Sequence, residues 1–185
     1  MKTVFLDRDG VINRDSSAYI KSWEEFEFIP GSLDAIKLLT DEMFTIIIIT
    51  NQSIVNRGMA TKNDLEQIFL NMKDAITRKG GKITDIFYCP HTPDENCSCR
   101  KPAPGMVFTA QKKYNIDLSR SCFVGDSEKD MECAKRAGCG CSVLVRTGSG
   151  PEAVTALANT GSAPDYVADD LLQAAKIIVT RFSPE

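Results

Sequence analysis

The sequence predicts an α/β protein with a doubly wound, mostly parallel β-sheet and helices on both faces. Short apolar runs alternate along the chain with segments of helical periodicity. One run, residues 44–49, is continuous and β-branched, which is typical of a strand buried on both faces of a parallel sheet. Polar clusters follow several of these runs, at the strand ends where such sheets bind ligands.

Strands are predicted where the apolar runs are short, namely at residues 4–6, 44–49, 83–88, 122–124, 142–145 and 166–167. Helices are predicted where apolar residues recur at helical spacing, starting at 30–32 and at 61, and covering 104–114, 128–137 and 171–180. The helix from Thr61 has Asp64 at capping-box spacing. Its predicted buried face consists of Leu65, Ile68, Phe69, Met72 and Ile76. Residues 11–30 show no sustained hydrophobic periodicity, which predicts a long irregular excursion of the chain between the first strand and the first helix.

Length and composition limit the possible classes of protein. A chain of 185 residues is most simply one domain, residues 1–185. The net charge of −3 leaves no basic surplus to bind a nucleic-acid backbone. No apolar run approaches the roughly 20 residues of a membrane span, and Asp7 precedes any signal-peptide core. We therefore expect a soluble cytoplasmic protein with no nucleic-acid or membrane partner.

The chain has seven cysteines, an odd number, and no export signal, so a disulfide framework is a poor interpretation. Cys89, Cys97 and Cys99 surround His91, the only histidine. Three thiols and one imidazole suit a four-coordinate Zn²⁺ ion with a structural role, because the protein fills every ligand position. The alternative is a few buried free cysteines beside an ordinary histidine. The other cysteines are predicted to be small core residues: Cys122, Cys133, Cys139 and Cys141.

Asp7 and Asp9 follow the first predicted strand. On an extended segment their side chains point the same way, whereas Arg8 is expected to point away from the site. Carboxylates this close repel each other unless one is protonated or a cation lies between them. With Asp126 arriving from another strand end, the residues predict a Mg²⁺ site. The alternative is that Asp7 and Asp9 only cap the following loop.

A carboxylate nucleophile beside Mg²⁺ points to phosphoryl transfer through an aspartyl-phosphate. Thr50 and Asn51, at a strand end, suit phosphoryl oxygens, and Lys101 supplies a positive charge. Asp9 is suited to protonate the leaving alcohol and then to activate water, which is acid–base work without histidine.

Five motifs in this order resemble the haloacid dehalogenase (HAD) superfamily, and the likeness covers nearly the whole chain. They are Asp7-Arg8-Asp9-Gly10-Val11-Ile12-Asn13, Thr50-Asn51-Gln52-Ser53, Cys89-Pro90-His91, Cys97-Ser98-Cys99-Arg100-Lys101-Pro102 and Val124-Gly125-Asp126. More narrowly, the chain resembles the zinc-containing D-glycero-D-manno-heptose 1,7-bisphosphate 7-phosphatases, with histidinol-phosphate phosphatases as close relatives. The resemblance implies a HAD-like Rossmannoid fold with no large cap domain, a zinc-bound loop and a monomer.

The resemblance also implies a Mg²⁺-dependent phosphatase that removes the C7 phosphate of a heptose bisphosphate, in nucleotide-activated heptose biosynthesis for lipopolysaccharide or another surface glycan. Asp7 is then the nucleophile and Asp9 the general acid/base. Mg²⁺ lies on Asp7, the Asp9 carbonyl and Asp126, while Thr50 and Lys101 steady the phosphoryl group. Implied contacts to the small-molecule sugar bisphosphate are Asp15, Ser16, Ser17, Ala18, Thr50, Asn51, Gln52, Ser53, Arg100 and Lys101.

Two positions depart from the family pattern. Ile54 stands where the family often has glycine, and Ser127 where it commonly has lysine; Lys129 is two residues further on. Histidinol phosphate is the rival substrate, and a zinc-loop binding module on a catalytically silent scaffold is the alternative from another class. A G-x-G-x-x-A match over residues 148–153 follows the fifth strand and contains Pro151, so it predicts a loop leading into a helix.

Overall fold

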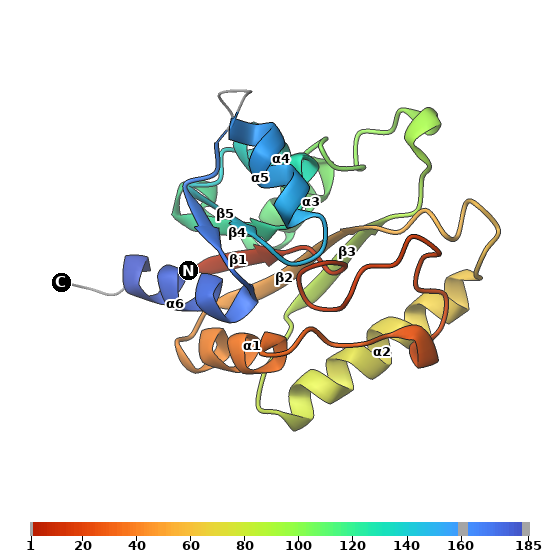
Figure 1. Ribbon diagram of the computed structural model, residues 1–185, viewed down its shortest axis with the longest axis horizontal. Coiled ribbons are helices and arrows are strands. Elements are labelled where there is room, and N and C mark those ends of the chain that lie inside the picture. Colours follow the sequence, from red (N-terminus) through yellow and green to blue (C-terminus); the bar gives the residue numbers. More distant parts are fainter. Residues whose placement is uncertain (1, 159–162, 183–185) are drawn as a thin grey trace.

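The computed structural model describes residues 2–158 and 163–182. The described residues form a six-stranded, all-parallel sheet in the order β3-β2-β1-β4-β5-β6 (Figure 1). The strands are β1 (Thr3–Leu6), β2 (Thr45–Asn51), β3 (Asp85–Cys89), β4 (Ser121–Gly125), β5 (Cys141–Val145) and β6 (Tyr166–Ala168). The predicted doubly wound α/β class is confirmed.

Helices cover both faces of the sheet. They are α1 (Ser32–Asp41), α2 (Lys62–Arg78), α3 (Gly105–Tyr114), α4 (Glu128–Ala137), α5 (Gly150–Ala158) and α6 (Leu171–Phe182). In Figure 1, α1, α2 and α6 lie on one side, and α3, α4 and α5 lie on the other. Three short 3₁₀ helices complete the described elements, at Trp23–Glu25, Pro93–Glu95 and Leu118–Arg120.

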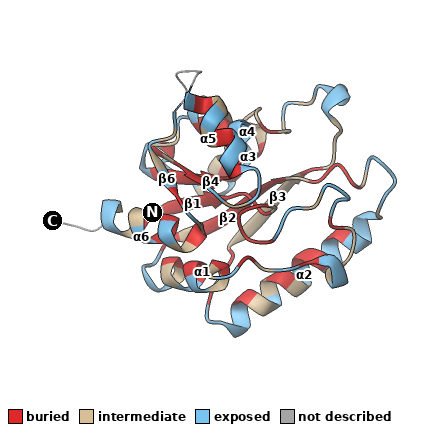
Figure 2. Cartoon of the chain, in the orientation of Figure 1, coloured by how far each residue is buried: buried red, intermediate tan, exposed pale blue. Residues whose placement is uncertain are grey.

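The central strand β1 is buried along its whole length because the sheet is covered on both faces (Figure 2). Successive side chains of a strand point to opposite faces. Accordingly, Val4 and Leu6 pack in the core beneath α1, α2 and α6. Phe5 packs in the second core, with residues of α3 and α4. Both layers therefore fix the end of β1, where Asp7 begins the first polar loop.

Local signals account for most element boundaries. Helix α2 starts after Thr61 with the predicted capping box, and its five predicted core residues are buried. Strand β3 starts at Asp85, later than predicted, because pairing with β2 begins where Asp85 lies opposite Ile47. Helix α5 is longer than the helix start predicted from the sequence, because Ala153 and Leu157 pack on α4 and β5.

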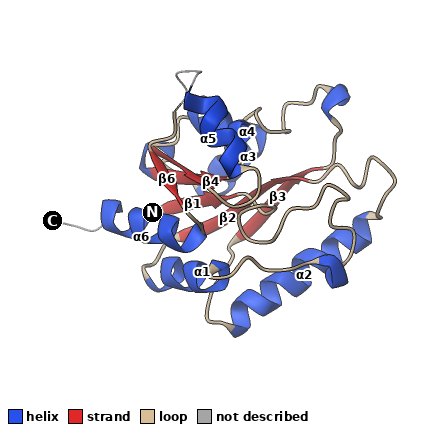
Figure 3. Ribbon diagram, in the orientation of Figure 1, coloured by secondary structure: helices blue, strands red, loops and turns tan. Residues whose placement is uncertain are grey.

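Four residues outside the cysteine–histidine loop were predicted to be core thiols. Cys122, Cys133 and Cys141 are buried, whereas Cys139 is half-buried. Within the described ranges, no helix has the length and apolar character to cross a membrane. Figure 3 shows long loops beyond the carboxyl ends of the central strands. Most of the predicted site residues lie on these loops, whereas Thr50, Asn51 and Cys89 are the last residues of their strands.

Candidate active site

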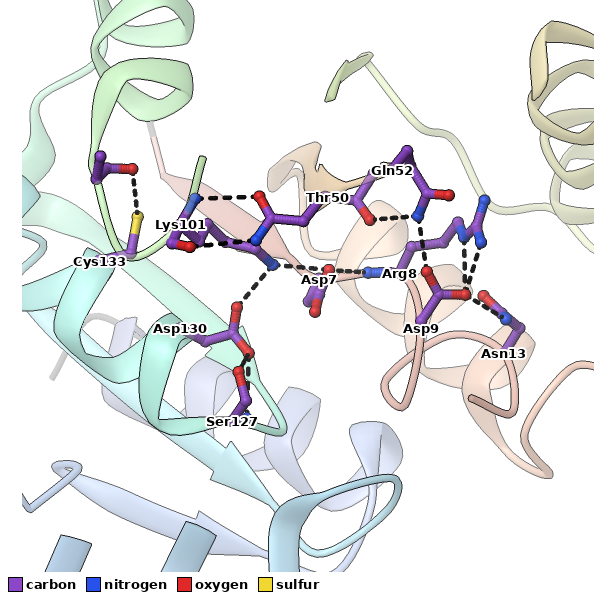
Figure 4. Close-up of polar contacts among 12 residues, drawn as sticks. Asp7, Arg8, Asp9, Asn13, Thr50, Gln52, Lys101, Ser127, Asp130 and Cys133 are labelled. Atoms are coloured by element: carbon purple, nitrogen blue, oxygen red, sulfur yellow. Dashed lines mark hydrogen bonds and ion pairs between the residues drawn. The ribbon is translucent and has the colours of Figure 1, made fainter. Parts of the chain in front are cut away.

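Asp7 and Lys101 form the centre of a buried charge cluster at the carboxyl edge of the sheet (Figure 4). The Lys101 Nζ lies 2.8 Å from Asp7 Oδ1 and 2.7 Å from Asp130 Oδ1. Lys101 is 3% exposed. Burial by itself lowers the pKa of Lys101, but the charges of Asp130 and Asp7 outweigh it and raise the pKa. The lysine is therefore held as a cation between two carboxylates.

A third carboxylate, Asp126, joins Asp7 and Asp130, and ligand oxygens of all three lie within 4.8 Å of one another. Burial raises the pKa of Asp7 to about 7, with Lys101 opposing the rise. Burial, followed by the charges of Asp7 and Asp130, raises the pKa of Asp126 to about 8. Three acids facing one lysine leave an excess of negative charge, which fits a hard divalent cation such as Mg²⁺.

Two glycines make room for Asp126. A Cβ added to Gly10, which has a φ of 79°, would lie 2.0 Å from Asp126 Oδ2, and one added to Gly148 would lie 2.1 Å from the same oxygen. The Ser149 amide donates a hydrogen bond to that oxygen at 2.8 Å. The Thr147 hydroxyl donates to the Gly10 carbonyl and ties the two loops together. The glycine-rich segment after β5 thus positions Asp126.

Asp9 occupies a different environment from Asp7. Its Oδ1 accepts hydrogen bonds from Arg8 Nη2 (2.6 Å) and Asn13 Nδ2 (2.9 Å), and its Oδ2 accepts one from Gln52 Nε2 (2.7 Å). Burial pushes the pKa of Asp9 upward, but the charge of Arg8 and the hydrogen bonds from Arg8, Asn13 and Gln52 hold it below its usual value. The prediction that Arg8 points away is wrong, because its 1%-exposed guanidinium turns back to Asp9.

The end of β2 supports both acids. Asn51 Nδ2 donates to the Lys101 carbonyl at 3.2 Å, and the Lys101 amide donates to Asn51 Oδ1 at 3.0 Å. Gln52 Nε2 donates to Thr50 Oγ1 at 2.9 Å as well as to Asp9. The side chains of Asn51 and Gln52, expected to contact substrate, are therefore engaged in fixing Lys101 and Asp9.

A cavity of about 320 Å³ opens onto these side chains. Its lining is mainly polar and comprises Asp7, Arg8, Asp9, Asp15, Ser16, Ser17, Tyr19, Ile20, Thr50, Asn51, Gln52, Ile54, Arg100, Lys101, Asp126, Ser127, Lys129 and Ser149. Two expected substrate contacts, Ala18 and Ser53, are not part of this lining. Ser127 donates its hydroxyl to Asp130, and Lys129 lies on the cavity wall.

The second cluster lies on the loop after β3. His91 Nδ1 lies 3.4 Å from Cys89 Sγ and 3.2 Å from Cys99 Sγ, and the three sulfurs lie 3.1–3.5 Å apart. Tetrahedral Zn²⁺ with bonds of about 2.3 Å separates its sulfur ligands by about 3.8 Å, so this donor set fits zinc after a small expansion. Burial raises the pKa of Cys89, so the apo thiol stays protonated and a bound cation is needed to stabilise the thiolate.

The thiol cluster leads directly into the acid cluster. Arg100 follows Cys99, and its amide lies 3.4 Å from Cys97 Sγ as a donor. Its Nη1 donates to the His91 carbonyl at 2.9 Å. The next residue is Lys101, so folding of the cysteine–histidine loop places both cations at the cavity.

Around the acid cluster, the sequence interpretation missed Asp130 and Ser149, and on the cavity wall it missed Tyr19 and Ile20. Asp130 is fully buried in the first turn of α4, four residues after Asp126. That spacing after a strand end was the available signal, since it returns a side chain of the first helical turn to the same edge. Ser149 contacts Asp126 through its backbone amide. Every residue except proline has such an amide, so the identity of the residue gives no signal in the sequence.

Comparisons with known proteins agree with this geometry. A family model described as HAD-hydrolase-like matches residues 98–174. The chain is 45% identical over 150 residues to the D-glycero-β-D-manno-heptose-1,7-bisphosphate 7-phosphatase of Bordetella bronchiseptica, covering 81% of this chain and 83% of the relative. It is 40% identical to a D-glycero-α-D-manno-heptose-1,7-bisphosphate 7-phosphatase of Photorhabdus laumondii, covering 80% and 84%.

A solved structure gives the same result in three dimensions. The D,D-heptose 1,7-bisphosphate phosphatase of B. bronchiseptica, crystallised with magnesium and phosphate, superposes with a TM-score of 0.91. The alignment has 40% sequence identity and covers 98% of this chain and 99% of that one. The likeness therefore extends over nearly the whole chain.

Proposed function

Because this chain belongs to the D-glycero-D-manno-heptose 1,7-bisphosphate 7-phosphatases of the HAD-like hydrolases, we propose that it removes the C7 phosphate of that sugar bisphosphate. The observation that carries the proposal is the buried group of Asp7, Asp126 and Asp130 around Lys101, at the wall of one cavity. The proposal includes a cytoplasmic, monomeric enzyme that supplies nucleotide-activated heptose synthesis.

In this proposal, Asp7 attacks phosphorus through a carboxylate oxygen, the bond to the C7 oxygen breaks, and an aspartyl-phosphate forms. Lys101 contacts Asp7 and is placed to steady the transferred phosphoryl oxygens together with the Thr50 hydroxyl. Mg²⁺ held by Asp7 and Asp126 would offset the repulsion between the carboxylate and the phosphate. Asp130 instead keeps Lys101 charged and oriented.

Asp9 carries the protons in both steps. In its protonated form it donates to the departing C7 oxygen, and as a carboxylate it then takes a proton from the water that attacks the phosphoenzyme. Inorganic phosphate leaves and Asp7 is restored. The donors around Asp9 lower its pKa, which favours the ionised form that the second step needs.

The far phosphate needs cations that the reaction centre does not use. Lys101 and Arg8 are already paired with carboxylates. Arg100 donates a hydrogen bond from Nη1 to the His91 carbonyl. The other N–H groups of its guanidinium are available to a phosphate in the cavity. Histidinol phosphate carries an amine cation at that end, which Arg100 would repel. The relatives are phosphatases, so the non-catalytic alternative is not retained.

A phosphate-release panel tests the proposal with the α- and β-anomers of the heptose bisphosphate and with histidinol phosphate. We expect the highest kcat/KM for a heptose bisphosphate, and EDTA should abolish turnover. Arg100→Ala should raise KM for the bisphosphate about tenfold or more, the scale of a charged hydrogen bond, while affecting small monophosphates less. A higher kcat/KM for histidinol phosphate would refute the proposed substrate.

A further inference from the structure

Tyr19 lines the cavity in a backbone conformation that bulky residues rarely adopt. Its φ is 63°, in the left-handed region, and the residue is 36% exposed. The Tyr19 amide donates to the Ser16 carbonyl at 2.9 Å. Lys21 Nζ donates to the carbonyls of Ala18 and Tyr19 at 2.8 and 3.3 Å. These contacts involve only backbone atoms of residues 16–19. They therefore hold the backbone of Tyr19 but do not fix the orientation of its ring.

Arg57, in the loop between β2 and α2, contacts that ring. Its guanidinium carbon lies 5.7 Å from the centroid of the Tyr19 ring, within cation–π range. Arg57 Nε also donates to Ser53 Oγ at 3.2 Å, and the Arg57 amide donates to the Ser53 carbonyl at 2.9 Å. Arg57 is not among the residues that line the cavity. It therefore contacts the ring without facing the cavity itself.

The loop that carries Arg57 is anchored on its other side. Asn56 Nδ2 donates to both carboxylate oxygens of Glu95, at 2.9 and 3.0 Å. Glu95 in turn accepts from the Thr92 amide at 2.6 Å, inside the cysteine–histidine loop. Both loops extend beyond the same end of the sheet as the excursion that contains Tyr19 (Figure 1). Arg57 is thus a fixed support for the ring.

We propose that Tyr19 is the wall of the cavity that faces the sugar, and that Arg57 is a positioning residue that holds the Tyr19 ring in place. The inference rests on the proposed function, since it assigns the carbohydrate part of that substrate to this wall. The phosphoryl group lies with Asp7 and Lys101, so the aromatic face of Tyr19 is left for the C–H groups of the sugar. Arg57 acts only through the ring.

Kinetics on heptose 1,7-bisphosphate test the inference. Arg57→Ala should raise KM about two- to fivefold, the effect of one exposed cation–π contact, and leave kcat close to wild type. Tyr19→Ala should raise KM at least as much, and adding Arg57→Ala to it should have no further effect. Arg57→Lys and Tyr19→Phe should stay near wild type because they keep the cation and the ring. Glycerol 3-phosphate, which has no sugar ring, should show no KM change.

Amide hydrogen exchange supplies a second readout that needs no substrate. Residues 16–20 should exchange faster in Arg57→Ala, and in Arg57→Met if the alanine variant does not fold. Arg78→Ala is the matched control, because Arg78 is an exposed arginine of α2 paired only with Asp74 among the ion pairs described. Unchanged exchange in the Arg57 variants, or a full Arg57→Ala effect in the Tyr19→Ala background, would overturn the inference. If exchange accelerates but the wild type does not hydrolyse heptose bisphosphate, the proposed function fails and the positioning of Tyr19 stands.

Discussion

The thiol cluster and the acid cluster are two candidate metal sites that the chain builds in opposite ways. Cys89, His91, Cys97 and Cys99 lie within eleven consecutive residues of one loop. Asp7 and Asp126 are more than a hundred residues apart and meet only because β1 and β4 are neighbours. One donor set is thus fixed by local spacing, and the other by the order of strands in the sheet.

The two clusters also differ in what they do for stability. The acid cluster concentrates buried carboxylates, and the raised pKa values of Asp7 and Asp126 show that its ionised form is unfavourable without a cation. The thiol cluster gathers its four donors within one loop, and metal binding to such a donor set contributes folding free energy. We infer that the thiol cluster stabilises the folded protein, whereas the acid cluster, where the reaction takes place, destabilises it.

Asp7→Asn should sharpen this contrast with the largest effect. We expect kcat to fall by at least about 10³-fold, the scale for loss of a covalent nucleophile. In EDTA the melting temperature should stay the same or rise, because a neutral amide replaces a buried carboxyl group with a raised pKa. Asp85→Asn, at the opposite end of the sheet, is the control and should keep activity. Appreciable turnover by Asp7→Asn would mean that water attacks phosphorus directly.

Cys99→Ser should have the opposite profile. Metal analysis should find about one zinc per chain in wild type and loss of zinc in the variant, with a destabilisation of more than about 2 kcal/mol, or at least about 4 °C in Tm. KM should rise, because the loop carries Arg100 and Lys101, while Asp7 remains functional. Cys139→Ser, a thiol outside the cluster, should keep its zinc. Wild-type protein purified without chelators and found free of zinc would contradict the assignment.

Asn51→Ala probes the junction between the two clusters. The substitution removes both hydrogen bonds that join β2 to the Lys101 backbone, worth about 1–3 kcal/mol together. We expect kcat to fall about tenfold, which corresponds to about 1.4 kcal/mol, with zinc content unchanged. Asn63→Ala on the exposed surface of α2 is the control. Wild-type kcat in Asn51→Ala would show that Lys101 is positioned by the cysteine–histidine loop alone.

The smallest expected effect is a pH trend in metal-free protein. An unfolded aspartate releases its proton near 3.8, whereas folded Asp7 and Asp126 hold theirs to about 7 and about 8. Between these values the folded state binds more protons than the unfolded state, so the free energy of unfolding should fall as pH rises from about 4 to about 8. Denaturant titrations in EDTA measure this fall, which Asp126→Asn should reduce. Stability that rises over this range would contradict the assignment.

Several features follow from the sequence because their causes are local. The capping box of α2 depends on a spacing of three residues between Thr61 and Asp64, and the structure contains it. The continuous apolar run at 44–49 predicts a strand covered on both faces, and β2 is such a strand. Likewise, polar residues that follow β1, β2 and β4 had to meet at one edge once the sheet was parallel.

The sequence by itself determined the fold class, the cysteine–histidine donor set and the acids at the strand ends, because short-range spacing and hydrophobic period encode them. Only the tertiary structure decided which partner each polar side chain takes. Arg8 pairs with Asp9, Asn51 holds the Lys101 backbone, and Asp130 completes the acid cluster. These pairings depend on distances of a few ångströms between side chains from different strands, helices and loops. The spacing of residues along the chain does not determine such distances.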